Sequence, residues 1–137
     1  QDLVRSLRRE FPGATFVEDA HTLRPWLRQI VNAIQGRTAA ADVPLDVRAT
    51  AFQWQVWTAL RTIPPGETRT YAEVAASLGR RGSARAVARA CAANPVAIAV
   101  PCHRVVPAAG GVGGYRWGAR RKADLLAREQ HPQHPAP

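Results

Sequence analysis

Residues 70–95 read TYAEVAASLGRRGSARAVARACAANP, a stretch that predicts two short helices joined by a tight turn. Thr70 followed by Glu73 is a capping-box pattern, which opens the first helix. Ser83 is the expected N-cap of the second helix, which runs on to the Asn-Pro pair that stops it. Because two short helices around a four-residue turn containing glycine are typical of a helix-turn-helix, we place such a unit at about 70–94.

The second of these helices has a surface suited to a polyanion. Arg85 and Arg89 lie four residues apart, so they share one helical face. Most other positions of this helix are alanine, which lets its backbone come close to a partner.

The charge distribution points to the same kind of partner. The chain has 19 basic and 10 acidic residues, a net charge of +9, yet residues 74–123 contain no acidic residue. Nine basic residues lie in that segment: Arg80, Arg81, Arg85, Arg89, Arg104, Arg116, Arg120, Arg121 and Lys122. Nucleic acid is the commonest partner of such a segment, and a solvated basic face in an arginine-rich protein is the alternative.

The residues upstream of this unit predict two parts. Thr50 with Gln53 is a second capping box, which begins a helix in the domain that we place at 46–130. Residues 1–45 predict a small N-terminal α/β lobe. Its helix is expected to be capped by Thr22, and its strand to lie at 11–17.

Downstream, residues 96–100 form an apolar run too short for a helix, which predicts a buried extended segment. A glycine-rich loop follows at 110–114, and a last helix is expected over about 120–129. Residues 131–137 are rich in proline and predict a disordered tail. The expected fold class is therefore α/β, a small N-terminal α/β lobe plus a mainly α-helical C-terminal domain with a helix-turn-helix.

Several classes of protein are excluded by the sequence. Its apolar runs are short and interrupted by charge, so we expect no membrane span. Cys91 and Cys102 make no disulfide framework, and no His/Cys set has zinc spacing. We expect no metal, no cofactor and a reducing cytoplasm as the location, with association to nucleic acid through the basic segment.

Cys102 is the candidate nucleophile, between Pro101 and His103 after the buried run. A free thiol has a pKa near ~8.5, so a neighbouring imidazole and an acid that orients it would raise the reactive thiolate fraction. Asp124 and Glu129 on the last helix are both candidates for that acid. The alternative is that Cys102 is a small buried apolar residue, since a Cys-His pair alone is weak evidence.

The motif Pro101-Cys102-His103-Arg104-Val105 resembles the active-site signature of the O6-alkylguanine-DNA alkyltransferases, also named methylated-DNA–protein-cysteine methyltransferases. Further matching motifs in family order are 50–53, 56–57, 63–64, 66–68, 71–73, 85–87, 92–94 and 114–118. Together they cover about Leu45 to Glu129. Cys91 and the Tyr-Arg-Trp-Gly sequence at 115–118 are most similar to the C-terminal part of the bacterial Ada-type regulators.

This resemblance implies a role for each matched residue. Cys102 would accept the alkyl group, His103 would act as its base through a bound water, and Glu129 would orient His103. The other implied roles are a brace for the active-site turn (Asn94), a donor to N3 of guanine (Tyr71), a finger that replaces the flipped nucleotide (Arg85), further DNA contacts (Ser83, Ala84 and Arg89) and the edge of the guanine pocket (Tyr71, Val105, Tyr115 and Arg116).

The implied function is DNA repair by direct reversal. One alkyl group would move irreversibly from O6 of guanine, or O4 of thymine, in double-stranded DNA to the protein, which acts once and as a monomer. The resemblance implies approach from the minor groove, whereas helix-turn-helix units usually enter the major groove. The alternatives are a part of an Ada-type transcriptional regulator and a non-catalytic module that binds lesions.

Overall fold

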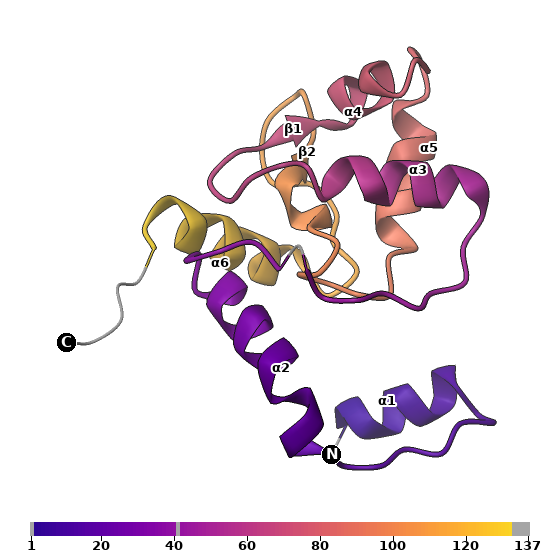
Figure 1. The fold of residues 1–137 in the computed structure, drawn as a ribbon. Coiled ribbons are helices and arrows are strands. Elements are labelled where there is room, and N and C mark those ends of the chain that lie inside the picture. Colours follow the sequence, from indigo (N-terminus) through magenta and orange to yellow (C-terminus); the bar gives the residue numbers. More distant parts are fainter. Residues whose placement is uncertain (1, 41, 133–137) are drawn as a thin grey trace.

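The computed structural model describes residues 2–40 and 42–132. Over these residues the fold is mainly helical with one small parallel sheet (Figure 1). Its elements are α1 (Asp2–Glu10), α2 (Ala20–Ile34), α3 (Ala51–Leu60), β1 (Arg69–Thr70), α4 (Tyr71–Ser77), α5 (Ala84–Ala92), the 3-10 helix η1 (Cys102–Arg104), β2 (Val105–Val106) and α6 (Ala119–Gln130). No helix in the described ranges is long and apolar enough to cross a membrane.

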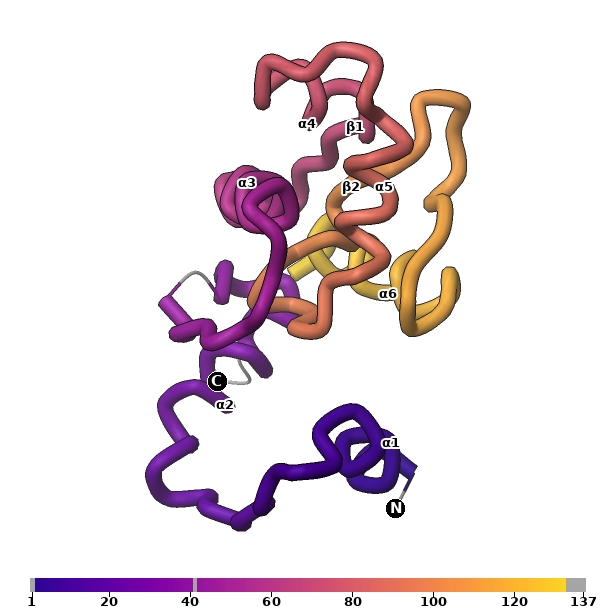
Figure 2. The backbone as a smooth tube through the Cα atoms, turned by 90° about the vertical axis from the view of Figure 1, so that its right-hand side faces the viewer, coloured from indigo at the N-terminus to yellow at the C-terminus, as the bar shows by residue number. Residues whose placement is uncertain are grey.

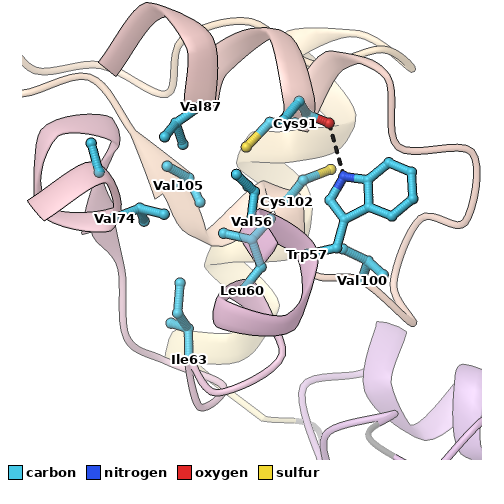
Figure 3. Close-up of a cluster of buried hydrophobic side chains, with 12 residues drawn as sticks. Val56, Trp57, Leu60, Ile63, Val74, Val87, Cys91, Val100, Cys102 and Val105 are labelled. Carbon is cyan, nitrogen blue, oxygen red and sulfur yellow. Dashed lines mark hydrogen bonds between the residues drawn. The ribbon is translucent and has the colours of Figure 1, made fainter. Parts of the chain in front are cut away.

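The core lies between α3, α4 and α5, which pack against one another (Figure 3). Val56 and Leu60 of α3 are fully buried and belong to the same cluster as Val87 of α5. Trp57 adds a polar link, since its indole Nε1 donates to the carbonyl of Ala90 at 2.9 Å. A buried indole with a satisfied N–H fixes α5 on α3.

In the C-terminal domain, two of the three predicted helix caps are confirmed. Thr50 with Gln53 and Thr70 with Glu73 form complete capping boxes, with both reciprocal hydrogen bonds present. Ser83 is the exception: it occupies the N-cap position of α5, but its side chain makes no capping hydrogen bond. Its backbone angles, φ −98° and ψ 24°, differ from the extended conformation that directs a capping side chain back to the helix.

The sheet joins two distant parts of the chain. β1 pairs with β2 in parallel, with Arg69 opposite Val105 and Thr70 opposite Val106. α4 begins immediately after β1, and η1 immediately precedes β2. This short pairing therefore holds the first residue of α4, Tyr71, close to the segment that carries Cys102.

The segment 96–100 is not extended, which corrects the sequence prediction. Val100 N–H donates to the carbonyl of Val96 at 3.1 Å, and Ala99 N–H donates to that of Ala97 at 2.8 Å. Ile98 has φ 73°, an uncommon angle for a β-branched residue. The chain folds back on itself here because the neighbouring core holds Ala99 and Val100 buried.

The N-terminal lobe contains no strand in residues 2–40, so the prediction of an α/β lobe with a strand at 11–17 is wrong. Pro12 and Gly13 form a turn directly after α1, and no described strand lies beside 14–17 to pair with its backbone. Asp19, not Thr22, caps α2, because its carboxylate accepts the Thr22 N–H at 2.9 Å. α1 has no buried residue and lies apart from the other helices (Figures 1 and 2), but Glu10 at its end is ion-paired with Arg116 of the C-terminal half at 3.2 Å.

The end of α2 is the part of this lobe that contacts the rest most closely. Gly36, at φ 72°, follows the end of α2 and lies directly against the backbone of Arg128 and Glu129 in α6. A β-carbon at Gly36 would be 2.2 Å from the Arg128 carbonyl oxygen, so only glycine fits. Of the predicted tail at 131–137, residues 133–137 lie outside the described residues.

Candidate active site around Cys102

Cys102 opens η1 and lies at the edge of the core, only 4% exposed. Burial raises the pKa of its thiol above the usual value, while a hydrogen bond from Asn94 and the positive charge of Lys122 lower it in part. The resting side chain is therefore mostly the neutral thiol near neutral pH. A nucleophile in this position needs a base that removes its proton.

Asn94 connects the end of α5 to the turn before Cys102. Its fully buried side-chain amide donates to the carbonyl of Val100 at 2.9 Å and to Cys102 Sγ at 3.3 Å. The side-chain oxygen Oδ1 of Asn94 accepts the Val96 N–H at 2.9 Å. All three contacts fix the backbone that delivers the thiol.

His103 and Arg104 share one buried carboxylate. His103 Nε2 lies 2.7 Å from Glu129 Oε1, and Arg104 Nη2 donates to the same oxygen at 2.8 Å. Arg104 Nε also donates to both carboxylate oxygens at 3.1 Å, and its Nη1 donates to the carbonyl of Ile63 at 2.7 Å. Burial opposes the charge on Glu129, but the hydrogen bonds from His103 and Arg104 outweigh it and lower the pKa of Glu129 to about 2.

The carboxylate in turn fixes the tautomer of His103. A carboxylate only accepts, so Nε2 carries the hydrogen and Nδ1 presents a lone pair. Nδ1 is buried and has no hydrogen-bond partner among the described residues. A buried acceptor without a partner, on the residue next to the thiol, is suited to receive a proton.

Glu129 is held from a second side by the turn after α3. The Gly66 N–H donates to Glu129 Oε2 at 3.3 Å, and Gln130 Nε2 donates to the Gly66 carbonyl at 2.7 Å. Asp124, the other acid left open by the sequence, is exposed on α6. Of the two candidates, Glu129 is therefore the acid that contacts His103.

A cavity of about 380 Å³ opens next to Cys102. This volume lies in the range of small-molecule sites, roughly 300–1,000 Å³. Its lining residues are Tyr71, Ala88, Cys91, Ala92, Cys102, Gly114, Tyr115 and Arg116. Burial raises the pKa of both tyrosines, so both are neutral hydroxyl donors at neutral pH.

Cys91 lies in the same cavity wall as Cys102, but its chemistry differs. Burial raises the pKa of Cys91 to about 12, which leaves almost no thiolate at neutral pH. No histidine is hydrogen-bonded to it among the described contacts. Cys102 differs in that the next residue in the chain, His103, has an acceptor nitrogen without a partner among the described residues.

The four residues predicted on α5 and at its start are not among the residues that line this cavity. Arg85 and Arg89 are exposed on α5, and Ser83 and Ala84 are half-buried at its start. Arg85 lies three and seven residues before the lining residues Ala88 and Ala92, so it shares their helical face.

Val105 and Arg116 were also predicted to edge the pocket, and the structure places them differently. Val105 is fully buried and is not a lining residue; its carbonyl accepts a hydrogen bond from Lys122 Nζ at 2.6 Å. Arg116 lines the cavity, and its guanidinium reaches the Asn94 carbonyl at 3.4 Å and Glu10 of α1 at 3.2 Å.

Two residues at the site were missed by sequence reasoning. Arg104 and Lys122 were counted among the charges of a basic surface, yet both are buried, 2% and 0% exposed. A signal was present for Lys122, because it is the only lysine in a chain with 19 basic residues. Arg104 had a signal as well, because it lies inside the Pro101–Val105 motif.

Comparison with known proteins identifies the family. Residues 51–131 match the profile of the 6-O-methylguanine DNA methyltransferase, DNA binding domain. The chain belongs to this family. The resemblance inferred from the Pro101–Val105 motif is thereby confirmed.

Relatives in the methyltransferase family match nearly the whole chain. It is 47% identical over 127 residues to the bifunctional transcriptional activator/DNA repair enzyme Ada of Escherichia coli K12, which covers 93% of this chain and 36% of Ada. It is 39% identical over 130 residues to the inducible methylated-DNA–protein-cysteine methyltransferase of Bacillus subtilis, covering 95% of this chain and 73% of that protein. This chain therefore spans about a third of the length of Ada.

A solved structure agrees with these matches. Mycobacterium tuberculosis OGT in complex with DNA superposes with a TM-score of 0.71 at 50% identity, covering 76% of this chain and 65% of that one. The fold of this chain is therefore the mixed helical fold of the OGT structures.

Proposed function

We propose that this protein repairs DNA by direct reversal, moving a methyl or other alkyl group from O6 of guanine to Cys102 in a single turnover. The observation that carries the proposal is the buried thiol of Cys102, which faces a base-sized cavity and stands next to a histidine with an unpartnered Nδ1. The names of the relatives, methylated-DNA–protein-cysteine methyltransferases, support the same activity.

The reaction follows from these contacts. The thiol proton of Cys102 passes to His103 Nδ1, directly or through one water, and Glu129 stabilises the imidazolium that forms. The thiolate attacks the alkyl carbon, a C–S bond forms and the bond from that carbon to O6 breaks. The electron pair of the broken bond stays with guanine, and a proton from the Tyr71 hydroxyl to N3 neutralises it.

The product explains why the protein would act once. The new thioether has no leaving group that His103 could activate, so Cys102 is not regenerated. The same displacement works for an alkyl group on O4 of thymine. The thymine is then the leaving group, and the electron pair of the broken bond stays on its exocyclic oxygen. No metal or cofactor enters these steps.

Access to the cavity requires the base to leave the stack. An alkyl group on O6 lies inside duplex DNA, and flipping a nucleotide costs a few kcal/mol, less for a damaged base. In this proposal α4 and α5 form a helix-turn-helix that docks on the duplex, and Arg85 at the rim of the cavity fills the space that the flipped nucleotide leaves. The crystal structure of a 50% identical relative in complex with DNA supports binding to DNA.

Intact-mass spectrometry tests the proposal. After mixing with duplex DNA that carries one O6-methylguanine, the protein mass should increase by one methyl group, and peptide mapping should place that group on Cys102. The Cys102→Ser variant should gain no mass. More than one demethylated base per protein molecule, or a methyl group on Cys91, would refute the proposal.

The match to Ada supports a second candidate function. The E. coli relative is named a transcriptional activator as well as a repair enzyme, and it shares 47% identity over 93% of this chain. In that case this chain would be the repair part of a regulator. A non-catalytic lesion-binding role is disfavoured by the presence of Cys102 with its base and acid.

A further inference from the structure

The side chain of Arg116 connects the cavity beside Cys102 to the otherwise separate helix α1. Arg116 lines the cavity, and its Nη1 donates to the backbone carbonyl of Asn94 at 3.4 Å. Its Nη2 donates to both carboxylate oxygens of Glu10, each at 3.2 Å. The guanidinium carbon also lies 5.4 Å from the centre of the Trp117 ring. One side of the guanidinium is therefore anchored beside the cavity, and the other side is bound to an acidic group.

The ion pair between Glu10 and Arg116 is one that a competing anion can replace. Its side chains are 41% and 36% exposed, so water reaches both groups. Both hydrogen bonds come from a single nitrogen, and their length of 3.2 Å exceeds the roughly 2.7–2.9 Å of strong charge-assisted hydrogen bonds. An exposed pair of this kind shifts an equilibrium by about fivefold at most.

Arg116 differs from the other exposed arginines of the acid-free segment 74–123. Seven arginines of this segment are exposed, and within the described residues only Arg116 forms an ion pair. Its partner, Glu10, lies 106 residues earlier in the sequence, on a helix in which no residue is buried. Since core packing does not hold α1 in place, the guanidinium itself attracts the carboxylate. The rim of the cavity at Arg116 is therefore a position that binds an anion.

We propose that Arg116 binds a backbone phosphate of the DNA strand whose base enters the cavity, and that Glu10 occupies this phosphate site in the free protein. The phosphates of a nucleotide are bonded to its sugar, so a base inside the cavity leaves its phosphates at the rim. A carboxylate and a phosphate both present paired oxygens to a guanidinium. Nη1 keeps its contact with residue 94 while Nη2 exchanges one anion for the other. This inference rests on the proposed function, since it places a flipped nucleotide in the cavity.

The affinity for methylated duplex DNA measures this competition, in a Cys102→Ser background that keeps the methyl group on the DNA. Glu10→Gln should raise the affinity about two- to fivefold at low salt, because DNA no longer has to break an exposed ion pair. Asp2→Asn is the matched control, since it removes the same charge from the other end of α1. It should raise the affinity by less than about 1.5-fold, because a distant exposed charge is screened. Equal gains in both variants would overturn the proposal, since they would reflect net charge alone.

A double-mutant cycle shows whether the gain depends on Arg116. In the Glu10→Gln background, Arg116→Gln should lower the affinity and reduce the magnitude of the salt slope by about 0.9, the contribution of one phosphate. In the Arg116→Gln background, Glu10→Gln should change the affinity by less than about 1.5-fold, because no guanidinium remains for which two anions compete. A full gain from Glu10→Gln without Arg116 would contradict the competition. A slope that Arg116→Gln leaves unchanged would contradict the phosphate contact.

The rate of methyl transfer separates phosphate binding from a structural role of the ion pair. With Cys102 intact and at saturating methylated duplex, Glu10→Gln should react at the wild-type rate, because the carboxylate has left Arg116 before the base is seated. A slower reaction would show that the ion pair holds the cavity in shape, and it would overturn the proposal. If the wild-type protein binds the duplex but gains no methyl group, the proposed function fails instead, and the binding cycle still decides the role of Arg116.

Discussion

At the scale of single residues, the site is a balance of buried charges. Arg104 neutralises Glu129 through a bidentate contact, Nε to Oε2 and Nη2 to Oε1, so Glu129 can remain a carboxylate without a positive charge on His103. This matters for the proposed chemistry, because His103 must start neutral to accept the Cys102 proton. Breaking such a buried pair by removing one partner typically costs about 3–5 kcal/mol, since it leaves an uncompensated charge.

The lowered pKa of Glu129 predicts how stability depends on pH. Its pKa falls from 4.5 in the unfolded chain to about 2 in the folded protein. The resulting stabilisation is complete above pH 4.5 and is lost as the pH falls toward about 2, and it amounts to roughly 3 kcal/mol. Urea unfolding between pH 6 and pH 2 should show this loss.

The matched variants are Glu129→Gln and Asp124→Asn, an exposed acid on the same helix. Glu129→Gln should be less stable at pH 6 and should lose most of the acid-dependent slope. Asp124→Asn should keep both the stability and the slope of the wild type. An unchanged slope in Glu129→Gln would contradict the buried carboxylate described above.

At the scale of elements, the role of α5 can be separated from the chemistry. Arg85 lies on the cavity-facing side of α5, at its solvent-exposed start. Arg85→Ala should therefore slow transfer from duplex DNA about tenfold or more, since the vacated base stack is no longer filled. The same variant should react with free O6-benzylguanine at the wild-type rate, because a free base needs no flipping.

Arg89→Ala is the control for this measurement, an exposed arginine one turn later on the same helix. It should weaken DNA binding without changing the rate at saturating DNA. Equal losses of Arg85→Ala with duplex DNA and with the free base would contradict the finger role.

The contact between α2 and α6 predicts a distant effect on the site. An alanine at Gly36 would place its β-carbon 2.2 Å from the Arg128 carbonyl, one residue before Glu129. The positive φ alone costs about 1–2 kcal/mol for alanine, and the clash adds to it by shifting α6. Gly36→Ala should lower both the urea midpoint and the rate with O6-benzylguanine.

Gly110→Ala is the comparison for Gly36→Ala. Gly110 also has a positive φ, 103°, but nothing lies within 4 Å of its β-carbon position. It should lose stability through strain alone and keep the rate. If both variants keep the wild-type rate, the α2 contact does not position Glu129.

These elements also show what the sequence could predict. Capping boxes at Thr50 and Thr70 are local hydrogen-bond patterns, so the sequence contains all that is needed to find them. The turn at 96–100 is different, because a positive φ is uncommon for a β-branched residue such as Ile98 and no local sequence signal predicts it. The prediction of a strand at 11–17 failed because a strand requires a pairing partner, which the local sequence does not reveal.

At the functional site, too, local patterns could be predicted and contacts between distant parts of the chain could not. Cys102 and His103 are adjacent in sequence, and the family motif marked them together. The buried positions of Arg104 and Lys122 depend on α6 folding back over η1 and β2, and charge counting placed both on the surface. The sequence signals for a special role were the place of Arg104 inside the family motif and the isolation of one lysine among arginines.

At the scale of the whole molecule, the positive charge is unevenly distributed. The acid-free segment 74–123 carries the entire excess, but two of its nine basic residues are buried. Seven arginines therefore remain for contact with phosphates. The rest of the chain carries ten basic and ten acidic residues and is neutral. A duplex should consequently bind to the face that presents this segment, with little dependence on sequence.

The salt dependence of the DNA-binding constant measures how many of these arginines contact phosphates. Each neutralised phosphate contributes about −0.9 to the slope of log binding constant against log salt, so seven arginines set a limit of about −6. The double variant Arg81→Gln/Arg89→Gln, which leaves Arg85 in place, should reduce the magnitude of the slope by about 2. Arg5→Gln/Arg8→Gln removes the same charge from α1, outside the acid-free segment, and should leave the slope unchanged. If both double variants change the slope equally, net charge and not the acid-free segment determines binding, because a uniform field would not distinguish α1 from that segment.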